Sequence, residues 1–242
     1  MRNCNLRIVA LRMVASAFVV VVFLCCPRSP WAQAEKAPYP AMAPLDRYLI
    51  ANESAEIALA RSAAPASVAD GAAVMVLGRH GYTTAVKGKN GFVCIVERSW
   101  ANAGDSPGFW NPKLRSPNCF NAAAARTFLP IYLMKTRLVL EGKSKAETVA
   151  MSIAALNKKE LPALAPGAMC YMMSKEQYLN DSGKAWHPHV MFFVSGDVAK
   201  SWGANLPGSP VIAVNDPEER VTVFMVLAPR WSDGTPGPAI GQ

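Results

Sequence analysis

The chain has 242 residues, of which 51% are hydrophobic and 17% charged, and its formal net charge is +8. Four of its 25 lysines and arginines, and none of its acidic residues, lie in residues 1–34, so the rest of the chain carries only +4. This remainder has short lysine pairs such as Lys158 and Lys159 but no basic stripe. Because nucleic-acid surfaces depend on clustered lysine and arginine, the composition argues against a nucleic-acid partner.

Residues 1–34 have the pattern of an export signal. A start with three arginines is followed by the apolar run "VASAFVVVVFLCC", which has 13 residues. A membrane span needs roughly 20 apolar residues, so this run is too short to be a typical anchor. Ala32 and Ala34 provide the small residues of an A-x-A cleavage site. We therefore expect cleavage after Ala34 and a secreted or periplasmic protein, with no transmembrane span after cleavage.

Two alternatives for this segment are an uncleaved anchor helix and a lipoprotein signal. Cys25 or Cys26 would be the lipid acceptor of a lipoprotein. The lipoprotein reading is less favoured because Leu24 and Cys25 occupy positions where a small residue is expected.

The remaining 208 residues of the 242 suit one domain. Residues 35–44 carry three prolines and predict an extended leader, and residues 45–232 form the expected single domain. Residues 233–242 are rich in glycine and proline and predict a flexible tail.

The first half of the domain starts with a helical region and then changes to strands. Residues 45–64 are rich in Ala, Leu and Glu and predict one or two helices, which Pro65 ends. Strands are expected at 73–77, 81–88 and 92–99. Between the last two stands the pair Asn90-Gly91, and this predicts a hairpin because both residues tolerate positive φ.

Two helices are expected next, followed by the remaining strands. Residues 121–142 have Asn121 as a cap and Pro130 as a kink or break, and residues 144–159 begin with a Ser144–Glu147 capping box. Further strands are expected at 168–173, 189–195, 210–214 and 220–229, with short helices at 174–181 and 196–205. This order predicts an α+β fold: a mostly antiparallel sheet with a helical pair inserted between strand groups.

Three cysteines follow the predicted signal, namely Cys94, Cys119 and Cys170. A pair of them would bridge in an oxidising compartment, and three pairings are open. Cys94 with Cys119 is favoured because this bridge would close a polar, disorder-prone loop, with a stabilisation of about 3 kcal/mol. Cys170 lies in the apolar run "AMCYMM" and is expected to be a buried, inert thiol.

The stretch "WHPHVMFF" holds two of the three histidines in the chain. If His187 and His189 are both extended, their side chains lie on one face, as in an H-x-H metal site. His80 as a third ligand would suit zinc, and Met191 would suit copper. Pro188 interrupts this pattern, and histidines at a sheet end often bond only to backbone groups or solvent. Glu97 is a further candidate, as an oxygen ligand or base.

The tryptophans and nearby phenylalanines lie mostly in loops and near strand ends. They suit either a lid over the core, which we favour, or a stacking surface for sugars or peptides. The set comprises Trp100, Phe109, Trp110, Trp186, Trp202 and Trp231.

The segments "NGFVC", "NCF" and "HPHVMFF" give the chain a family resemblance. It resembles a group of uncharacterised secreted bacterial proteins that have an NG-aromatic-x-C turn, a second cysteine after a polar loop and a PH-x-M strand. The likeness covers about residues 70–230 and implies no known activity. It supports the pairing of Cys94 with Cys119 and favours His189 over His187.

From the sequence we expect an exported, single-domain binding or structural module of the cell envelope that has no cofactor. Its functional face is expected at the sheet end where His189, the Cys94–Cys119 loop and the tryptophans would meet. The alternative is a metal-dependent enzyme, such as a hydrolase, in which His80, His187 and His189 hold zinc or copper. The ligand, the partners and the oligomeric state are left open.

Overall fold

The computed structural model describes residues 38–182, 185–209 and 211–239. They belong to one compact unit, Ala37–Gln242, and the predicted signal peptide at 1–34 lies outside the described residues. Within the described ranges, no helix is both long and apolar enough to cross a membrane.

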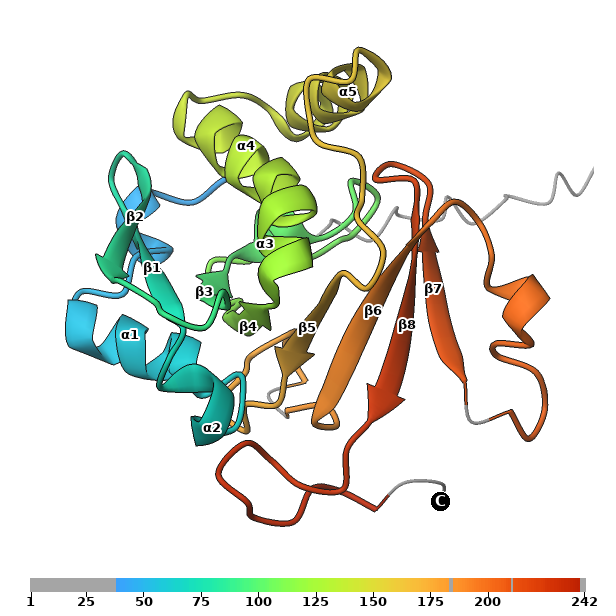
Figure 1. Cartoon of the computed structure of the whole chain (residues 1–242). Coiled ribbons are helices and arrows are strands. Elements are labelled where there is room, and N and C mark those ends of the chain that lie inside the picture. The colour runs from blue at the N-terminus through green and yellow to red at the C-terminus, as the bar shows by residue number, and fades with distance from the viewer. Residues whose placement is uncertain (1–37, 183–184, 210, 240–242) are drawn as a thin grey trace, which may run out of the picture. The chain divides into compact units, whose positions relative to one another are not determined.

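The centre of the unit is an eight-stranded sheet in the order β2-β1-β3-β4-β5-β6-β8-β7 (Figure 1). Only β1 and β3 pair in parallel; every other neighbouring pair is antiparallel. The α+β class with a mostly antiparallel sheet is therefore confirmed. The strands are β1 (Ala73–Gly78), β2 (Gly81–Val86), β3 (Val93–Glu97), β4 (Ser116–Phe120), β5 (Met169–Met172), β6 (His189–Ser195), β7 (Ile212–Asp216) and β8 (Val221–Leu227).

The α-helices are α1 (Glu53–Arg61), α2 (Ala66–Ala69), α3 (Ala122–Thr127), α4 (Leu129–Leu140) and α5 (Lys145–Asn157). Short 3-10 turns lie at η1 (Leu45–Arg47), η2 (Ser99–Ala101) and η3 (Lys200–Trp202). The insertion between β4 and β5 has three helices rather than a pair, because the chain breaks before Pro130, which lies in the first turn of α4. The capping box of Ser144 and Glu147 at the start of α5 is confirmed.

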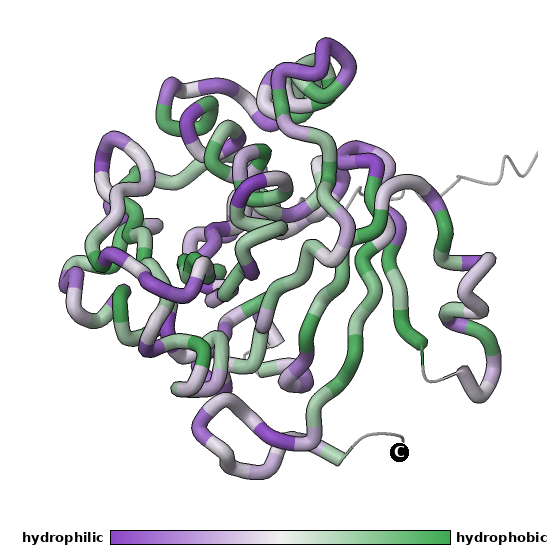
Figure 2. Tube along the Cα trace, in the orientation of Figure 1, coloured by the Kyte–Doolittle hydropathy of each residue, from purple (hydrophilic) through white to green (hydrophobic). Residues whose placement is uncertain are grey.

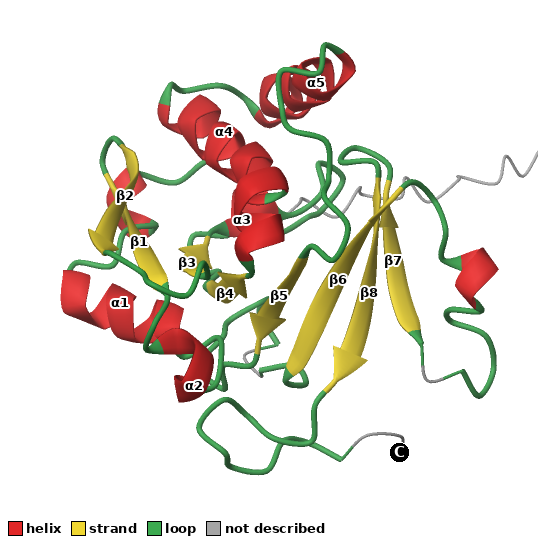
Figure 3. Cartoon of the chain, in the orientation of Figure 1, coloured by secondary structure: helices red, strands yellow, loops and turns green. Residues whose placement is uncertain are grey.

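Alternating side chains of the central strands supply two cores, one on each face of the sheet. Figure 3 shows the helices α3 and α4 on one side of these strands and α1 on the other. Ile95, Phe120 and Phe193 pack on one face with residues of α3 and α4. On the other face, Val96 and the two bridging cysteines pack against the end of α1. Because strand residues alternate between faces, neighbouring residues of β3 and β4 serve opposite cores.

The predicted hairpin at Asn90-Gly91 is wrong. β1 lies between β2 and β3, and the hairpin of this region joins β1 to β2, with Gly78 opposite Gly81. Gly91 does have positive φ, at 80°, but the Asn90 side chain donates to the Val68 carbonyl at 2.7 Å. This long-range contact turns the chain back alongside β1, so that β3 adds to β1 in parallel.

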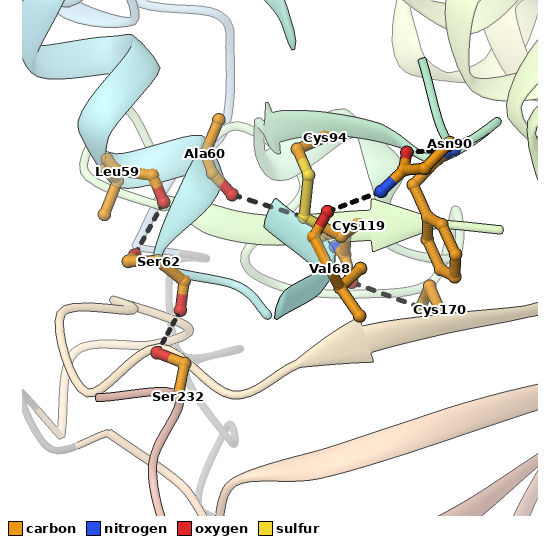
Figure 4. Close-up of a disulfide and its surroundings, with 11 residues drawn as sticks. Leu59, Ala60, Ser62, Val68, Asn90, Cys94, Cys119, Cys170 and Ser232 are labelled. Atoms are coloured by element: carbon orange, nitrogen blue, oxygen red, sulfur yellow. Dashed lines mark hydrogen bonds between the residues drawn. A yellow bond between two sulfur atoms is a disulfide. The ribbon is translucent and has the colours of Figure 1, made fainter. Parts of the chain in front are cut away.

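The predicted disulfide is present between Cys94 and Cys119 (Figure 4). These residues are direct partners in the antiparallel β3–β4 pair, with their Cα atoms 4.0 Å apart. Both are fully buried beside the Ala60 carbonyl of α1. Cys170 is a buried free thiol, and its Sγ donates to the Asn118 side chain at 3.4 Å.

A buried ion pair, which the sequence reasoning did not identify, fastens α1 to the sheet. Arg98 Nη2 lies 2.9 Å from Glu56 Oε1, and both side chains are at most 1% exposed. The same Glu56 oxygen accepts the Leu77 N–H of β1, and Arg98 Nε donates to the Tyr48 carbonyl. Both buried charged groups therefore have hydrogen-bond partners in addition to each other.

Two predictions near the end of the chain need correction. Residues 174–181 form turns and an isolated bridge instead of a helix, because the Tyr178 backbone N–H and carbonyl both pair with the backbone of Arg115. The segment 233–242, expected as a free tail, is hydrogen-bonded in its first part. Gly237 N–H donates to the Pro229 carbonyl, and between them residues 231–235 form a tight turn.

Candidate functional site

The structure does not bring the three histidines together. His80 lies in the β1–β2 turn, whereas His187 and His189 lie at the start of β6. Three strands separate β1 from β6, which corresponds to about 19 Å at the usual strand spacing. Among the residues that the structure describes, no group of three His, Cys, Asp or Glu side chains is arranged to hold a metal ion.

His189 has the surroundings of a core residue. It is 2% exposed, its Nδ1 donates to the His187 carbonyl at 2.7 Å, and its ring packs edge-on against Trp186. Burial lowers the pKa of His189, which favours the neutral ring. Within the H-x-H stretch, the His189 ring therefore holds the backbone of His187 in place through this hydrogen bond.

The aromatic residues do not form one face either. Trp100, Phe109 and Trp110 are buried in the core that α4 covers, as the favoured core interpretation expects. Trp202 stacks on Phe224 near the far edge of the sheet, and Trp186 lies beside His189. The expected meeting point of His189, the disulfide loop and the tryptophans is therefore not formed.

An apolar cavity of about 760 Å³ lies between the helices α3–α5 and the end of the sheet, and we call it the groove. One wall is the α3–α4 junction with Phe128 and Ile131, and another is the segment 159–164 that follows α5. The third wall consists of the end of β6 and the β7–β8 turn (Figure 1). Apolar strands lead up to this hydrophilic turn, as Figure 2 shows.

A smaller cavity of about 150 Å³, the inner chamber, adjoins the groove and shares Phe128, Ile131 and Glu219 with it. Its polar lining includes Glu97, Asn118, Asp216 and Glu219, and its apolar lining includes Phe120, Phe128, Phe193, Ile131, Met191 and Val223. The carboxyl group of Glu97, from β3, therefore lies near those of Asp216 and Glu219, from the β7–β8 turn, and phenylalanine rings surround them.

Glu97 is a carboxyl group of the inner chamber with a strongly raised pKa. It is the last residue of β3 and lies on the same face as Ile95, and its Oε2 accepts from Asn118 Nδ2 at 2.9 Å. Burial, followed by the charge of Glu219, raises the pKa of Glu97 to about 8. The Glu97 carboxyl is consequently protonated at neutral pH, despite its hydrogen bond from Asn118.

Glu219 forms a buried ion pair with Lys135 of α4. Lys135 Nζ lies 2.5 Å from Glu219 Oε1, and the two side chains are 2% and 11% exposed. Burial acts to lower the pKa of Lys135, but the neighbouring Glu219 carboxylate outweighs it and the net shift is upward. Burial also raises the pKa of Glu219, against the opposing effect of Lys135.

The β7–β8 turn is held in place by three consecutive charged residues. Both carboxylate oxygens of Glu218 accept the Gly104 N–H, Glu219 binds Lys135, and Arg220 donates to Asn157 at the end of α5. Arg220 has a left-handed backbone, with φ 59°. These contacts position the turn as a wall of the groove.

The sequence reasoning named Glu97 but missed Lys135 and Glu219. A signal for Lys135 exists, since it stands among the apolar residues of the helix "LPIYLMKTRLVL", where a buried charge needs a partner. The groove and the inner chamber together form an apolar cavity that ends in a few ionisable groups, which is the usual composition of a small-ligand site. No family model, curated protein or solved structure matches the chain.

Proposed function

We propose that the protein is an exported binding module whose small, largely apolar ligand lies in the groove and reaches the inner chamber. One observation carries this proposal: the apolar groove of about 760 Å³ adjoins the cluster in which Glu97 keeps a proton at neutral pH. Apolar walls supply affinity by removing ligand surface from water, and a few polar groups fix the orientation of the ligand.

Export is supported by two independent features of the chain. Residues 1–34 have the basic, apolar and small-residue order of a signal peptide. The Cys94–Cys119 disulfide fits an oxidising compartment such as the periplasm or the extracellular space.

Binding is favoured over the metal-dependent enzyme because of where the candidate ligands lie. The enzyme hypothesis requires His80 beside His187 and His189, and three strands separate them. Ligand binding in the groove does not require the histidines to converge, because the walls of the groove come from elements that already pack together.

The proposal is tested by narrowing the groove at an exposed position that the core does not use. Ala163 is exposed and lines the groove, so Ala163→Trp fills part of it without disturbing packed residues. Ala58 is an exposed alanine of α1 on the other side of the sheet, and Ala58→Trp is the matched control.

A neutral apolar dye, N-phenyl-1-naphthylamine, reports occupancy through its fluorescence. We expect saturable dye binding to the protein without residues 1–34, at least tenfold weaker binding to Ala163→Trp, and unchanged binding to Ala58→Trp. No saturable binding, or equal weakening in both variants, would refute the proposal.

A further inference from the structure

We propose that the inner chamber binds the ammonium group of an amphiphilic organic cation whose apolar part lies in the groove. This inference rests on the proposed function and specifies its ligand class. It follows from the charge of the chamber, from its aromatic walls and from a buried ammonium that the fold already holds there.

The first argument is charge. Three carboxyl groups line the chamber, from Glu97, Asp216 and Glu219, and no lysine or arginine is among its described lining residues. The adjacent Lys135 pairs with Glu219. Glu97 has a neutral partner, the Asn118 amide, which binds only one of its carboxyl oxygens. When all these groups are ionised, the chamber carries an excess of negative charge that a ligand cation would neutralise.

The second argument is the composition of the walls. Phe128 and Phe193 stack with their centroids 3.8 Å apart, and Phe120 lies 6.3 Å from Phe193. All three line the chamber. Aromatic rings attract cations, and together with carboxylates they form the usual surrounding of quaternary ammonium ligands. An anionic ligand would gain nothing from these walls and would be repelled by the carboxylates.

The third argument is a precedent inside the molecule. The Lys135 ammonium is 2% exposed and is held by Glu219 at 2.5 Å, beside the chamber. The carboxylates of this cluster therefore already stabilise one buried ammonium group. A ligand ammonium beside Glu97 would repeat this arrangement on the open side of the cluster, where the cavity leaves room for it.

Binding of a cation would be coupled to proton release. Glu97 faces Glu219 and Asp216 from the β7–β8 turn and Lys135 from α4, and its pKa is raised to about 8. A bound cation favours the ionised carboxylate, so Glu97 must lose its proton when the ligand enters below pH 8. Affinity should rise with pH up to about 8, by at most tenfold per unit, with about one proton released at pH 7.

The test compares ligands that share one chain and differ in the head group. Octyltrimethylammonium, 1-octanol and octanoate compete with the neutral dye at pH 6, 7 and 8. We expect octyltrimethylammonium to displace the dye at a concentration at least tenfold lower than 1-octanol at pH 8, and octanoate to be the weakest. Calorimetry in two buffers of different ionisation enthalpy should show proton release at pH 7.

The variants separate the head-group site from the groove. Glu97→Gln should abolish the pH dependence and most of the preference for octyltrimethylammonium, while binding of 1-octanol remains. Glu141→Gln, an exposed substitution at the end of α4, should leave both unchanged. Equal binding of octyltrimethylammonium and 1-octanol by the unmodified protein refutes the cation site but keeps the proposed function. Failure of all three ligands and of the dye refutes the proposed function itself.

Discussion

Replacing Glu97 by glutamine should remove the loss of folding stability that ionisation of Glu97 causes as the pH rises. Burial and the charge of Glu219 raise the pKa of Glu97 from 4.5 to about 8. Between these values the folded chain binds the Glu97 proton and the unfolded chain does not. The stability that this proton contributes is therefore complete below pH 4.5 and is lost as the pH rises through 8.

The magnitude follows from the size of the shift. Each pKa unit corresponds to about 1.4 kcal/mol, so a rise from 4.5 to about 8 sets an upper limit of roughly 5 kcal/mol. Glu97 is partly exposed to the inner chamber, so water there reduces the effect, and we expect about 2–4 kcal/mol over the whole titration. Glutamine does not titrate, and its carbonyl oxygen can still accept from Asn118.

The assay is urea unfolding of both proteins at pH 5, 7 and 9, followed by tryptophan fluorescence. The free energy of unfolding of Glu97→Gln, relative to the unmodified protein, should increase by about 1–3 kcal/mol from pH 5 to pH 9, because part of the effect is already lost at pH 5. Exposed Glu141→Gln serves as the control, and its pH profile should follow that of the unmodified protein. Parallel profiles for Glu97→Gln and the unmodified protein would show that Glu97 is ionised at neutral pH, and the reasoning about the chamber would fail.

Two further predictions concern the parts that hold the fold together. Replacing Cys94 and Cys119 by alanine should lower the free energy of unfolding by about 3.5 kcal/mol, because the bridge spans 25 positions, and an unchanged urea midpoint would contradict this. Arg98→Met should cost about 3–5 kcal/mol because it leaves the Glu56 carboxylate buried without its charge partner. Adding Glu56→Gln should recover part of that loss in the same unfolding assay, and strictly additive losses would contradict the coupling.

Local signals in the sequence predicted much of the fold correctly. The capping box of Ser144 and Glu147 places the start of α5, since both hydrogen bonds are formed within four residues. The hairpin at Asn90-Gly91 fails because the Asn90 side chain reaches Val68, 22 residues away, and this long-range hydrogen bond sets the course of the chain. A turn sequence fixes the local backbone but not which strands become neighbours.

The candidate site was only partly accessible from the sequence. Glu97 stood out as a polar residue at the end of an apolar strand, but its raised pKa depends on burial by the fold and then on Glu219, which lies far away in the chain. Lys135 and Glu219 are 84 positions apart, and no local pattern joins them. For the histidine pair, the sequence suggested a site that the structure does not form. The spacing of His187 and His189 is that of a metal site, but the fold buries His189 beside Trp186.

Two buried ion pairs in the described part of the chain show why the groove is the stronger functional candidate. Burying a charge is costly unless hydrogen bonds match it on every side. Around Arg98 and Glu56 these bonds are formed by backbone groups of Tyr48, Leu77 and Val96, so the pair is closed and serves to fasten α1. The pair of Lys135 and Glu219 borders a cavity instead, and beside it Glu97 keeps a proton rather than gaining a cationic partner. Glu97 therefore avoids the cost of burying a charge by staying protonated, and in our proposal a cation that enters from the groove takes the place of that proton.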